Sequence, residues 1–157
     1  MITDLPAAAT AGGKTRTLIA ALPALARLHG RTVVAEVAAT VLAEEPLRAA
    51  LAEDLTLLRL VGVRPVVVPD RAAPPGAPAE LVRLLGASRG GAAGLAGEPN
   101  PAAVRALVDA GVVPVLLGAR AAGGPVDGLA EELGEDALVR TVDGRQPHAL
   151  LAGLLAE

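Results

Sequence analysis

Few residues of this sequence have side chains suited to catalysis or to binding a charged ligand, and its single lysine is the first of them. Lys14 lies in residues 8–15 (AATAGGKT), which fit the relaxed phosphate-loop pattern. VVVPD, ending at Asp70, imitates the strand that presents an aspartate to magnesium in such proteins. A working phosphate loop leaves a buried strand, and the preceding MITDLP is no such strand. A P-loop NTPase is therefore only a minor alternative.

Three acidic or imidazole side chains are the other candidates, and each has a structural interpretation. Asp127 in PVDGLAEELG stands just before Leu129, where an aspartate favours a helix N-cap. His148 precedes the apolar residues 149–155, which predicts a helix-start residue in contact with solvent. Glu36 is predicted to be a solvated residue at the end of a strand.

Composition excludes several classes of function. The chain has 157 residues, a net charge of −3 and no Phe, Tyr or Trp, so it lacks the positive charge and aromatic faces that bind nucleic acid. It has no cysteine and only two, distant histidines, so no metal site is expected. Neither a signal peptide nor an apolar run of about 20 residues is visible. We expect a soluble, cytoplasmic protein with no membrane contact.

Apolar periodicity and turn residues predict helices alternating with strands. A helix over residues 15–28 contains Pro23, which should kink it, and an amphipathic helix spans residues 45–60. The inward face of the second helix is predicted to carry Leu47, Ala50, Leu51, Leu55 and Leu58. The predicted strands are residues 32–37, 65–68, 92–95, 112–117 and 138–142, and the further helices are residues 79–85, 101–110, 129–133 and 149–155.

This alternation predicts an α/β fold, a three-layer sandwich with a mainly parallel sheet. Residues 1–14 are rich in Ala and Gly and carry no apolar pattern. We expect them to form a flexible N-terminal tail before a single domain of residues 15–157.

Four segments, in one order, resemble the acetylglutamate kinases of the amino acid kinase family. The segments are residues 21–70, GLAG at 94–97, NPAAVRALVDAGVVPVLL at 100–117, and VDGRQPHALLAGLL at 142–155. The resemblance implies an amino acid kinase-like fold in truncated form. It also implies the family reaction, the ATP-dependent phosphorylation of the N-acetyl-L-glutamate side-chain carboxylate in arginine biosynthesis, with ATP and Mg²⁺ as cofactors if the chain is active.

The same resemblance implies roles for individual residues. Gly94 and Gly97 match, weakly, a glycine turn of the nucleotide site. Asp127 matches the aspartate that orients the two catalytic lysines of the family. His148 matches a histidine that contacts feedback arginine in arginine-sensitive members, so a remnant ligand role stays open beside the solvated helix start. Residues 15–28 resemble the N-terminal helix that joins dimers of those members into hexamers.

The departures from the family fall where phosphate or substrate would be handled. Glu36 stands in the place of the first lysine, Ala-Ala-Thr at residues 38–40 replaces Gly-Gly-Asn, and Asp-Arg-Ala at residues 70–72 replaces Gly-Gly-Gly-Pro. Phosphoryl transfer depends on cations and backbone amides at the phosphates. We therefore predict a pseudoenzyme, catalytically impaired or inactive. The alternative is a non-catalytic oligomerisation or regulatory module that uses residues 15–28 to associate with a second copy of itself or with an intact acetylglutamate kinase.

Overall fold

The computed structural model describes residues 4–70, 72–86, 91–95, 100–117, 126–134, 137–142 and 146–156. Strands and helices alternate along most of this chain. In chain order the elements are α1 Asp4–Leu28, β1 Thr32–Val37, α2 Ala39–Ala43, α3 Glu45–Leu60, β2 Arg64–Pro69, α4 Ala77–Gly86, β3 Ala92–Leu95, α5 Pro101–Asp109, β4 Val113–Leu116, α6 Val126–Leu133, β5 Leu138–Val142 and α7 Ala149–Leu155.

The strands form one five-stranded sheet in the order β3-β4-β2-β1-β5, and every strand pairing is parallel. Its central strand β2 has the sequence RPVVVP and is buried from its second residue onward. Continuous apolar strands of this kind are typical of parallel sheets covered on both faces. The predicted α/β class with a mainly parallel sheet is confirmed.

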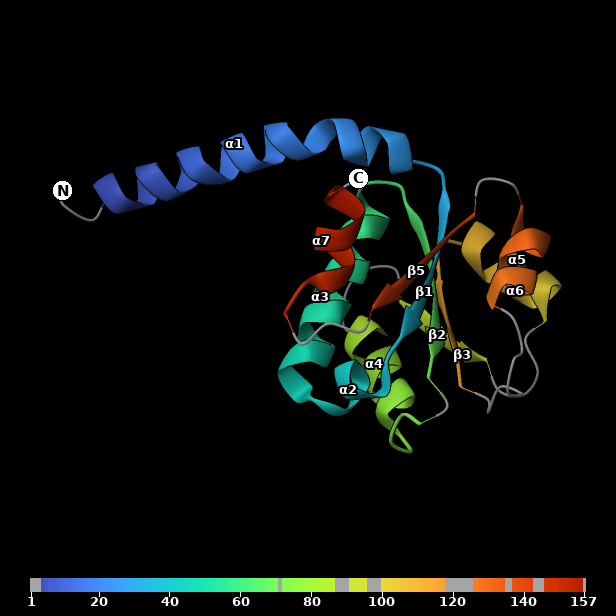
Figure 1. Ribbon diagram of the computed structural model, residues 1–157. Coiled ribbons are helices and arrows are strands. Elements are labelled where there is room, and N and C mark those ends of the chain that lie inside the picture. Colours follow the sequence, from blue (N-terminus) through green and yellow to red (C-terminus); the bar gives the residue numbers. More distant parts are fainter. Residues whose placement is uncertain are drawn as a thin grey trace.

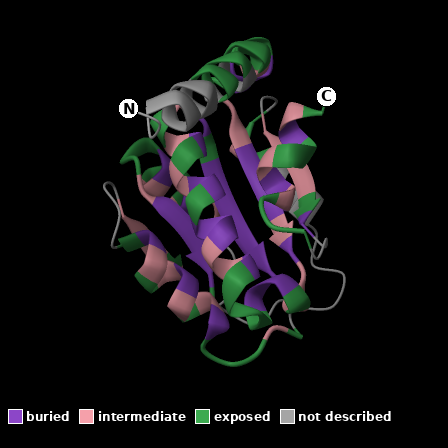
Figure 2. Cartoon of the chain, turned by 90° about the vertical axis from the view of Figure 1, so that its left-hand side faces the viewer, coloured by how far each residue is buried: buried purple, intermediate pink, exposed green. Residues whose placement is uncertain are grey.

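Helices cover both faces of the sheet (Figure 1). On one face α2, α3, α4 and α7 pack over Val33, Ala35 and Val37 of β1. On the other face α5 and α6 pack over Val34 of the same strand. Successive side chains of a strand point to opposite faces, so this one strand contributes to both cores. The buried residues accordingly run through the middle of the molecule (Figure 2), and the three-layer sandwich is confirmed.

The connections that follow the neighbouring strands β2 and β4 lead to opposite faces of the sheet. After β2 the chain passes to α4 on the first face, whereas after β4 it passes to α6 on the second face. In open α/β sheets, ligands bind where such connections diverge, outside the carboxyl ends of the strands. Asp70 and Leu117 directly follow β2 and β4 at this edge, and residues 71, 96–99, 118–125 and 143–145 lie outside the described part of the chain.

The helix α1 extends beyond the body of the protein (Figure 1). Its last turns are anchored by the buried Ala24, Leu25 and Leu28, whereas Ile19 and Leu22 are 61% and 51% exposed. The helix begins at Asp4, so the start predicted at residue 15 is wrong. Alanine favours a helix without needing an apolar face, which is why periodicity gave no signal there. The division into a tail of residues 1–14 and a domain of residues 15–157 stays a prediction.

One short helix was not predicted. The helix α2 lies between β1 and α3, in a segment for which no element was predicted, and its Val41 and Leu42 are buried. The remaining boundaries agree with the predictions to within three residues at each end, and the inward face predicted for α3 is buried throughout. Among the described residues, no helix combines the length and apolar character that crossing a bilayer requires.

Candidate functional site

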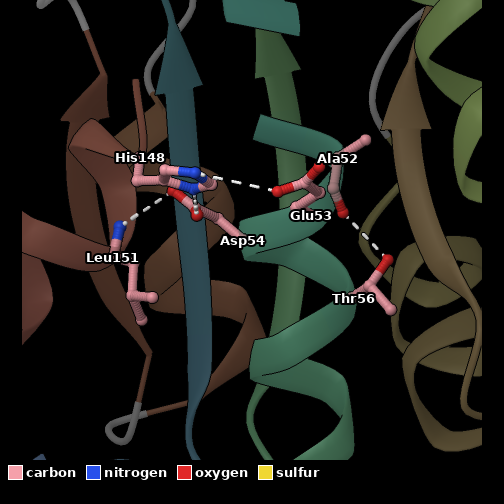
Figure 3. Close-up of polar contacts among 6 residues, drawn as sticks. All are labelled: Ala52, Glu53, Asp54, Thr56, His148 and Leu151. Atoms are coloured by element: carbon pink, nitrogen blue, oxygen red, sulfur yellow. Dashed lines mark hydrogen bonds and ion pairs between the residues drawn. The ribbon is translucent and has the colours of Figure 1, made fainter. Parts of the chain in front are cut away.

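A histidine and a buried aspartate from distant parts of the chain meet between α3 and α7 (Figure 3). The Nδ1 atom of His148 lies 2.5 Å from Oδ1 of Asp54, and the backbone amide of Leu151 donates to Oδ2 of the same carboxylate at 3.2 Å. The other ring nitrogen of His148, Nε2, lies 3.7 Å from Oε2 of Glu53. The imidazole therefore lies between two carboxylates.

The apolar stripe of α3 places Asp54 in the core. Leu47, Leu51 and Leu58 lie on the same helix face and are all buried, and the Asp54 side chain is 1% exposed. His148 is the N-cap of α7, with φ of 62°, and its own side chain makes no capping bond. A left-handed backbone is unusual for a residue other than glycine. The carboxylate of Asp54 instead accepts an amide from the first turn of α7, so it links the two helices.

The short contact changes the acidity of both groups. The hydrogen bond to Asp54 raises the pKa of His148 above its ordinary value, although desolvation opposes the effect. Burial raises the pKa of Asp54, and hydrogen bonds from His148 and the Leu151 amide lower it in part. Both effects follow from placing a carboxylate in the core with a cationic partner.

The surroundings of this pair leave little space for a reaction. The crevice beside Asp54 and His148 has a volume of about 10 Å³, which is roughly the space of one water molecule. The other ring nitrogen of the imidazole, Nε2, lies beside Glu53. The arrangement can hold a proton and tie α7 to α3, and it has no room for a small-molecule substrate at Nδ1.

At the carboxyl ends of the strands, the described residues include two acidic side chains, Glu36 and Asp70. The hydroxyl of Thr141 in β5 donates to Oε2 of Glu36 in β1 at 3.3 Å, across a pair of residues in register. Asp70 follows β2, and its Oδ1 accepts the backbone amide of Ala72 at 2.9 Å. That bond closes a local turn, as aspartate side chains commonly do. Glu36 is partly exposed, in agreement with the prediction of a strand-end residue.

The remaining predicted site residues are described only in part. Asp127 belongs to the first turn of α6, which begins at Val126, so the predicted N-cap role of Asp127 is wrong; its side chain is not among those described. Gly94 lies within β3 rather than in a turn, and a Cβ there would approach Cδ1 of Leu117 to 2.3 Å. Gly97 is outside the described residues, so the weak nucleotide-binding role of the two glycines stays a prediction.

The phosphate-loop interpretation of residues 8–15 is contradicted. These residues lie inside α1, and no strand precedes this helix among the described residues. A phosphate-binding loop must leave a strand so that its amides converge on the phosphates, and amides inside a helix are occupied by the helix itself. A P-loop NTPase is therefore not a candidate function.

Sequence reasoning missed Asp54 although one signal was present. The residue lies seven positions after Leu47 and four before Leu58, which is a core position in the apolar stripe of α3. A charged residue in such a position is rarely buried without a partner. The prediction that His148 starts a helix is confirmed. The apolar stripe of α3 does not show that Asp54 pairs with His148, because the two residues are 94 positions apart in the sequence.

Among the described residues, no group of three His, Cys, Asp or Glu side chains is placed to hold a metal ion. The His148 cluster contains one imidazole and two carboxylates, but the ring nitrogen that faces inward is already hydrogen-bonded to Asp54.

Comparison with known proteins gives partial matches. No family model matches the chain. It is 49% identical over 55 residues to the acetylglutamate kinase of Nocardioides sp., a match that covers 35% of this chain and 18% of that protein. It is 40% identical over 82 residues to the acetylglutamate kinase of Saccharopolyspora erythraea, covering 52% and 27%. The corresponding enzyme of Streptomyces griseus is 49% identical over 59 residues, covering 38% and 19%.

A solved structure supports the same fold. The N-acetylglutamate synthase from Neisseria gonorrhoeae, complexed with coenzyme A and L-arginine, superposes with a TM-score of 0.52 at 16% identity, over 79% of this chain and 46% of that one. At this identity the similarity concerns the fold alone. The matched segments amount to less than a third of the length of each kinase relative.

Proposed function

We propose that the chain, which is similar to acetylglutamate kinases over part of its length, is a relative of the amino acid kinase family that keeps the family scaffold without the family's phosphoryl-transfer activity. The reaction in question is the phosphorylation of the N-acetyl-L-glutamate side-chain carboxylate by ATP, with Mg²⁺. The proposal includes a cytoplasmic location. Any residual activity would depend on ATP and Mg²⁺, and the chain would otherwise need no cofactor.

Glu36 is the observation that carries this proposal. It lies next to the last residue of β1, at the sheet edge where α/β proteins bind ligands, and it accepts a hydrogen bond from Thr141. A unit charge about 4 Å from a phosphate oxygen contributes about 4 kcal/mol at the effective dielectric near a protein surface. That contribution is favourable for the lysine of the family and unfavourable for a glutamate.

The only lysine of the chain does not replace the missing cation. Lys14 lies in α1, whose last residue Leu28 leads into the amino end of β1. The fourteen residue steps from Lys14 to Leu28 correspond to about 21 Å along a helix axis. Figure 1 shows α1 on the side of the amino ends of the strands, away from the edge that carries Glu36.

Acyl-phosphate trapping with hydroxylamine tests the proposal. The purified chain and the intact kinase of Streptomyces griseus are assayed side by side with MgATP and N-acetyl-L-glutamate. Because removal of a single transition-state donor costs about 10²–10³ in rate, we expect this chain to be more than about 10³-fold slower. A rate within about tenfold of the intact kinase would contradict the proposal. Glu36→Lys restores one cation without the glycine turns, and we expect that variant to stay inactive.

A second candidate is a non-catalytic oligomerisation module, and the exposed side of α1 favours it. Ile19 and Leu22 expose apolar surface on a helix whose last turns are anchored to the body by Ala24, Leu25 and Leu28. Association with a second copy, or with an intact acetylglutamate kinase, would bury that surface. Light scattering behind a sizing column should show a mass above that of the monomer, and Leu22→Gln should lower it while Arg16→Gln does not. A strictly monomeric mass, unchanged by an added intact kinase, would contradict this role.

The regulatory role of His148 belongs to this second candidate. If the residue is a remnant arginine ligand, calorimetric titration of arginine should give saturable heat with the original chain and none with His148→Asn. Equal heats from the two proteins, or no heat from either, would leave His148 with its helix-linking role alone.

A further inference from the structure

A cavity of about 360 Å³ opens at the amino edge of the sheet, opposite to the edge that carries Glu36. Three turns line it, each of which ends a helix and starts a strand: α1 to β1, α3 to β2, and α5 to β4. Small-molecule sites commonly measure roughly 300–1,000 Å³, so this cavity is large enough for a compact ligand. Neither the kinase reaction nor the predicted site residues use it.

Backbone geometry holds an imidazole in the wall of this cavity. Gly62 has φ of 90°, and a Cβ at that position would lie 2.1 Å from Nδ1 of His29. The absence of a side chain therefore allows the ring to lie against the turn. Nδ1 of His29 is 2.9 Å from the carbonyl oxygen of Val61 and acts as the donor to it. With the proton on Nδ1, Nε2 of the neutral ring is an acceptor, which suits a ligand hydroxyl group.

Two guanidinium groups give the cavity its charge. Arg59 donates to the carbonyl oxygens of Gly91, at 3.4 Å, and Gly111, which ties two strand-starting segments together. Nη1 of Arg64 lies 3.3 Å from Oδ1 of Asp109. Among the charged residues of the described lining, two arginines are opposed by a single carboxylate. The balance favours an anion over a cation.

The pair formed by Arg64 and Asp109 can open at little cost. Its two side chains are 49% and 62% exposed, and exposed ion pairs contribute only about 0–1 kcal/mol. A carboxylate or phosphate group would offer Arg64 a bidentate partner, which is the stronger arrangement. Arg64 is therefore the residue best able to exchange an intramolecular partner for a ligand.

The ends of three helices oppose anion binding, but side chains reduce this effect. The C-termini of α1, α3 and α5 point their carbonyl groups toward this edge, and helix C-termini disfavour negative charge. The carbonyl oxygens of Val61 and Gly111 in these turns already accept hydrogen bonds from His29 and Arg59. Arg64, at the start of β2, adds a positive charge that these carbonyl groups do not use.

We propose that this amino-edge cavity binds a compact oxyanion, a small molecule with carboxylate or phosphate groups, whose anionic oxygens accept from the guanidinium of Arg64 while a hydroxyl group of the same molecule donates to Nε2 of His29. Arg59 has a positioning role, because it fixes the turns that form the wall. The site is independent of the kinase question, since it lies at the other end of the sheet.

Calorimetric titration with inorganic phosphate, and separately with citrate, tests this site at low ionic strength and constant pH. Saturable binding of either anion is expected, and the anion that binds more tightly identifies the chemistry. Arg64→Gln should weaken binding at least about tenfold, because a charge-assisted hydrogen bond is lost. The matched control is Arg83→Gln, which removes an exposed arginine paired with Glu80 on α4 and should leave binding unchanged.

A variant that should bind the anion more tightly shows that weaker binding by Arg64→Gln is not caused by misfolding. Asp109→Asn removes the carboxylate that competes for Arg64, so it should tighten binding of the same anion severalfold. The absence of saturable binding by both anions would overturn the proposal. So would equal weakening by Arg64→Gln and Arg83→Gln, or weaker binding by Asp109→Asn.

Discussion

The contact between Asp54 and His148 gives the sharpest prediction about stability. Asp54→Asn keeps an oxygen that can accept the Leu151 amide but removes the charge that faces the imidazole. A hydrogen bond between charged groups contributes about 1.5–3 kcal/mol. His148 is 47% exposed, so solvent screening reduces that value. We expect Asp54→Asn to lower the free energy of unfolding by about 1–2 kcal/mol near pH 6.

The effect should depend on pH with a defined sign. Because Asp54 raises the pKa of His148 in the folded protein, the stability from this pair is complete below the ordinary value of 6.5. It is lost as the pH rises through the higher, folded-state pKa. Burial raises the pKa of Asp54 as well, and a carboxyl group whose folded-state pKa is raised also contributes stability that is lost as the pH rises. Both groups therefore predict a loss of stability with rising pH, and the His148→Asn variant measures the share that belongs to His148.

A double-mutant cycle measures the pair directly. Asp54→Asn, His148→Asn and the double variant are unfolded in urea and followed by circular dichroism, because the chain has no Trp or Tyr for fluorescence. Asparagine suits position 148 because it tolerates a positive φ. We expect a coupling energy of about 1–2 kcal/mol near pH 6 that falls by at least half near pH 9.

Glu53→Gln is the matched control for this cycle. Glu53 is 73% exposed and 3.7 Å from the imidazole, so its loss should cost less than about 0.5 kcal/mol. A coupling energy below about 0.5 kcal/mol near pH 6 would refute the reasoning, because that is the level at which independent sites add. A coupling energy that grows with pH would refute it equally.

Two further predictions concern the scaffold, and both use urea unfolding. Gly62→Ala places a Cβ against His29 at a positive φ and should lower the free energy of unfolding by about 2–4 kcal/mol. Its control is Gly153→Ala, inside α7 with nothing within 4 Å, which should raise the free energy of unfolding by about 0.5–1 kcal/mol. Equal effects would contradict the close approach of His29 to Gly62. Leu55 is fully buried, so Leu55→Ala should lower the free energy of unfolding by about 2–5 kcal/mol. Leu57 is 39% exposed, so Leu57→Ala should lower it by less than about 1 kcal/mol. The reverse order would show that the buried face of α3 is wrongly assigned.

The elements with the clearest sequence signals were predicted best. The strand over residues 32–37 follows the glycine turn at Gly30, and the helix over residues 45–60 precedes the one at Gly62; both carry strong apolar patterns and were placed at their observed bounds. The start of α1 was missed because its alanine-rich first half has helix propensity without an apolar face. The helix α2 was missed because five residues are too few to show a period.

The contacts of the candidate site depend on how the elements assemble. The hydrogen bond between Glu36 and Thr141 joins residues 105 positions apart, and it exists because β5 pairs with β1 rather than with β4. Periodicity identifies strands but does not give their order in a sheet. The link between His148 and Asp54 likewise requires α7 to pack on α3. The sequence marked Asp54 as unusual by its place in an apolar stripe, but it held no sign of its partner.

The most direct test of the account is a single-turnover experiment that detects even slow chemistry. The chain, in excess over ATP labelled at the γ-phosphate, is mixed with Mg²⁺ and N-acetyl-L-glutamate, and transfer of the label to the substrate carboxylate is followed over hours. With Glu36 at the end of β1 and the only lysine in α1, we predict no transfer above a blank without protein. Transfer of the label to the substrate within seconds would contradict the claim that the scaffold remains without its phosphoryl-transfer chemistry.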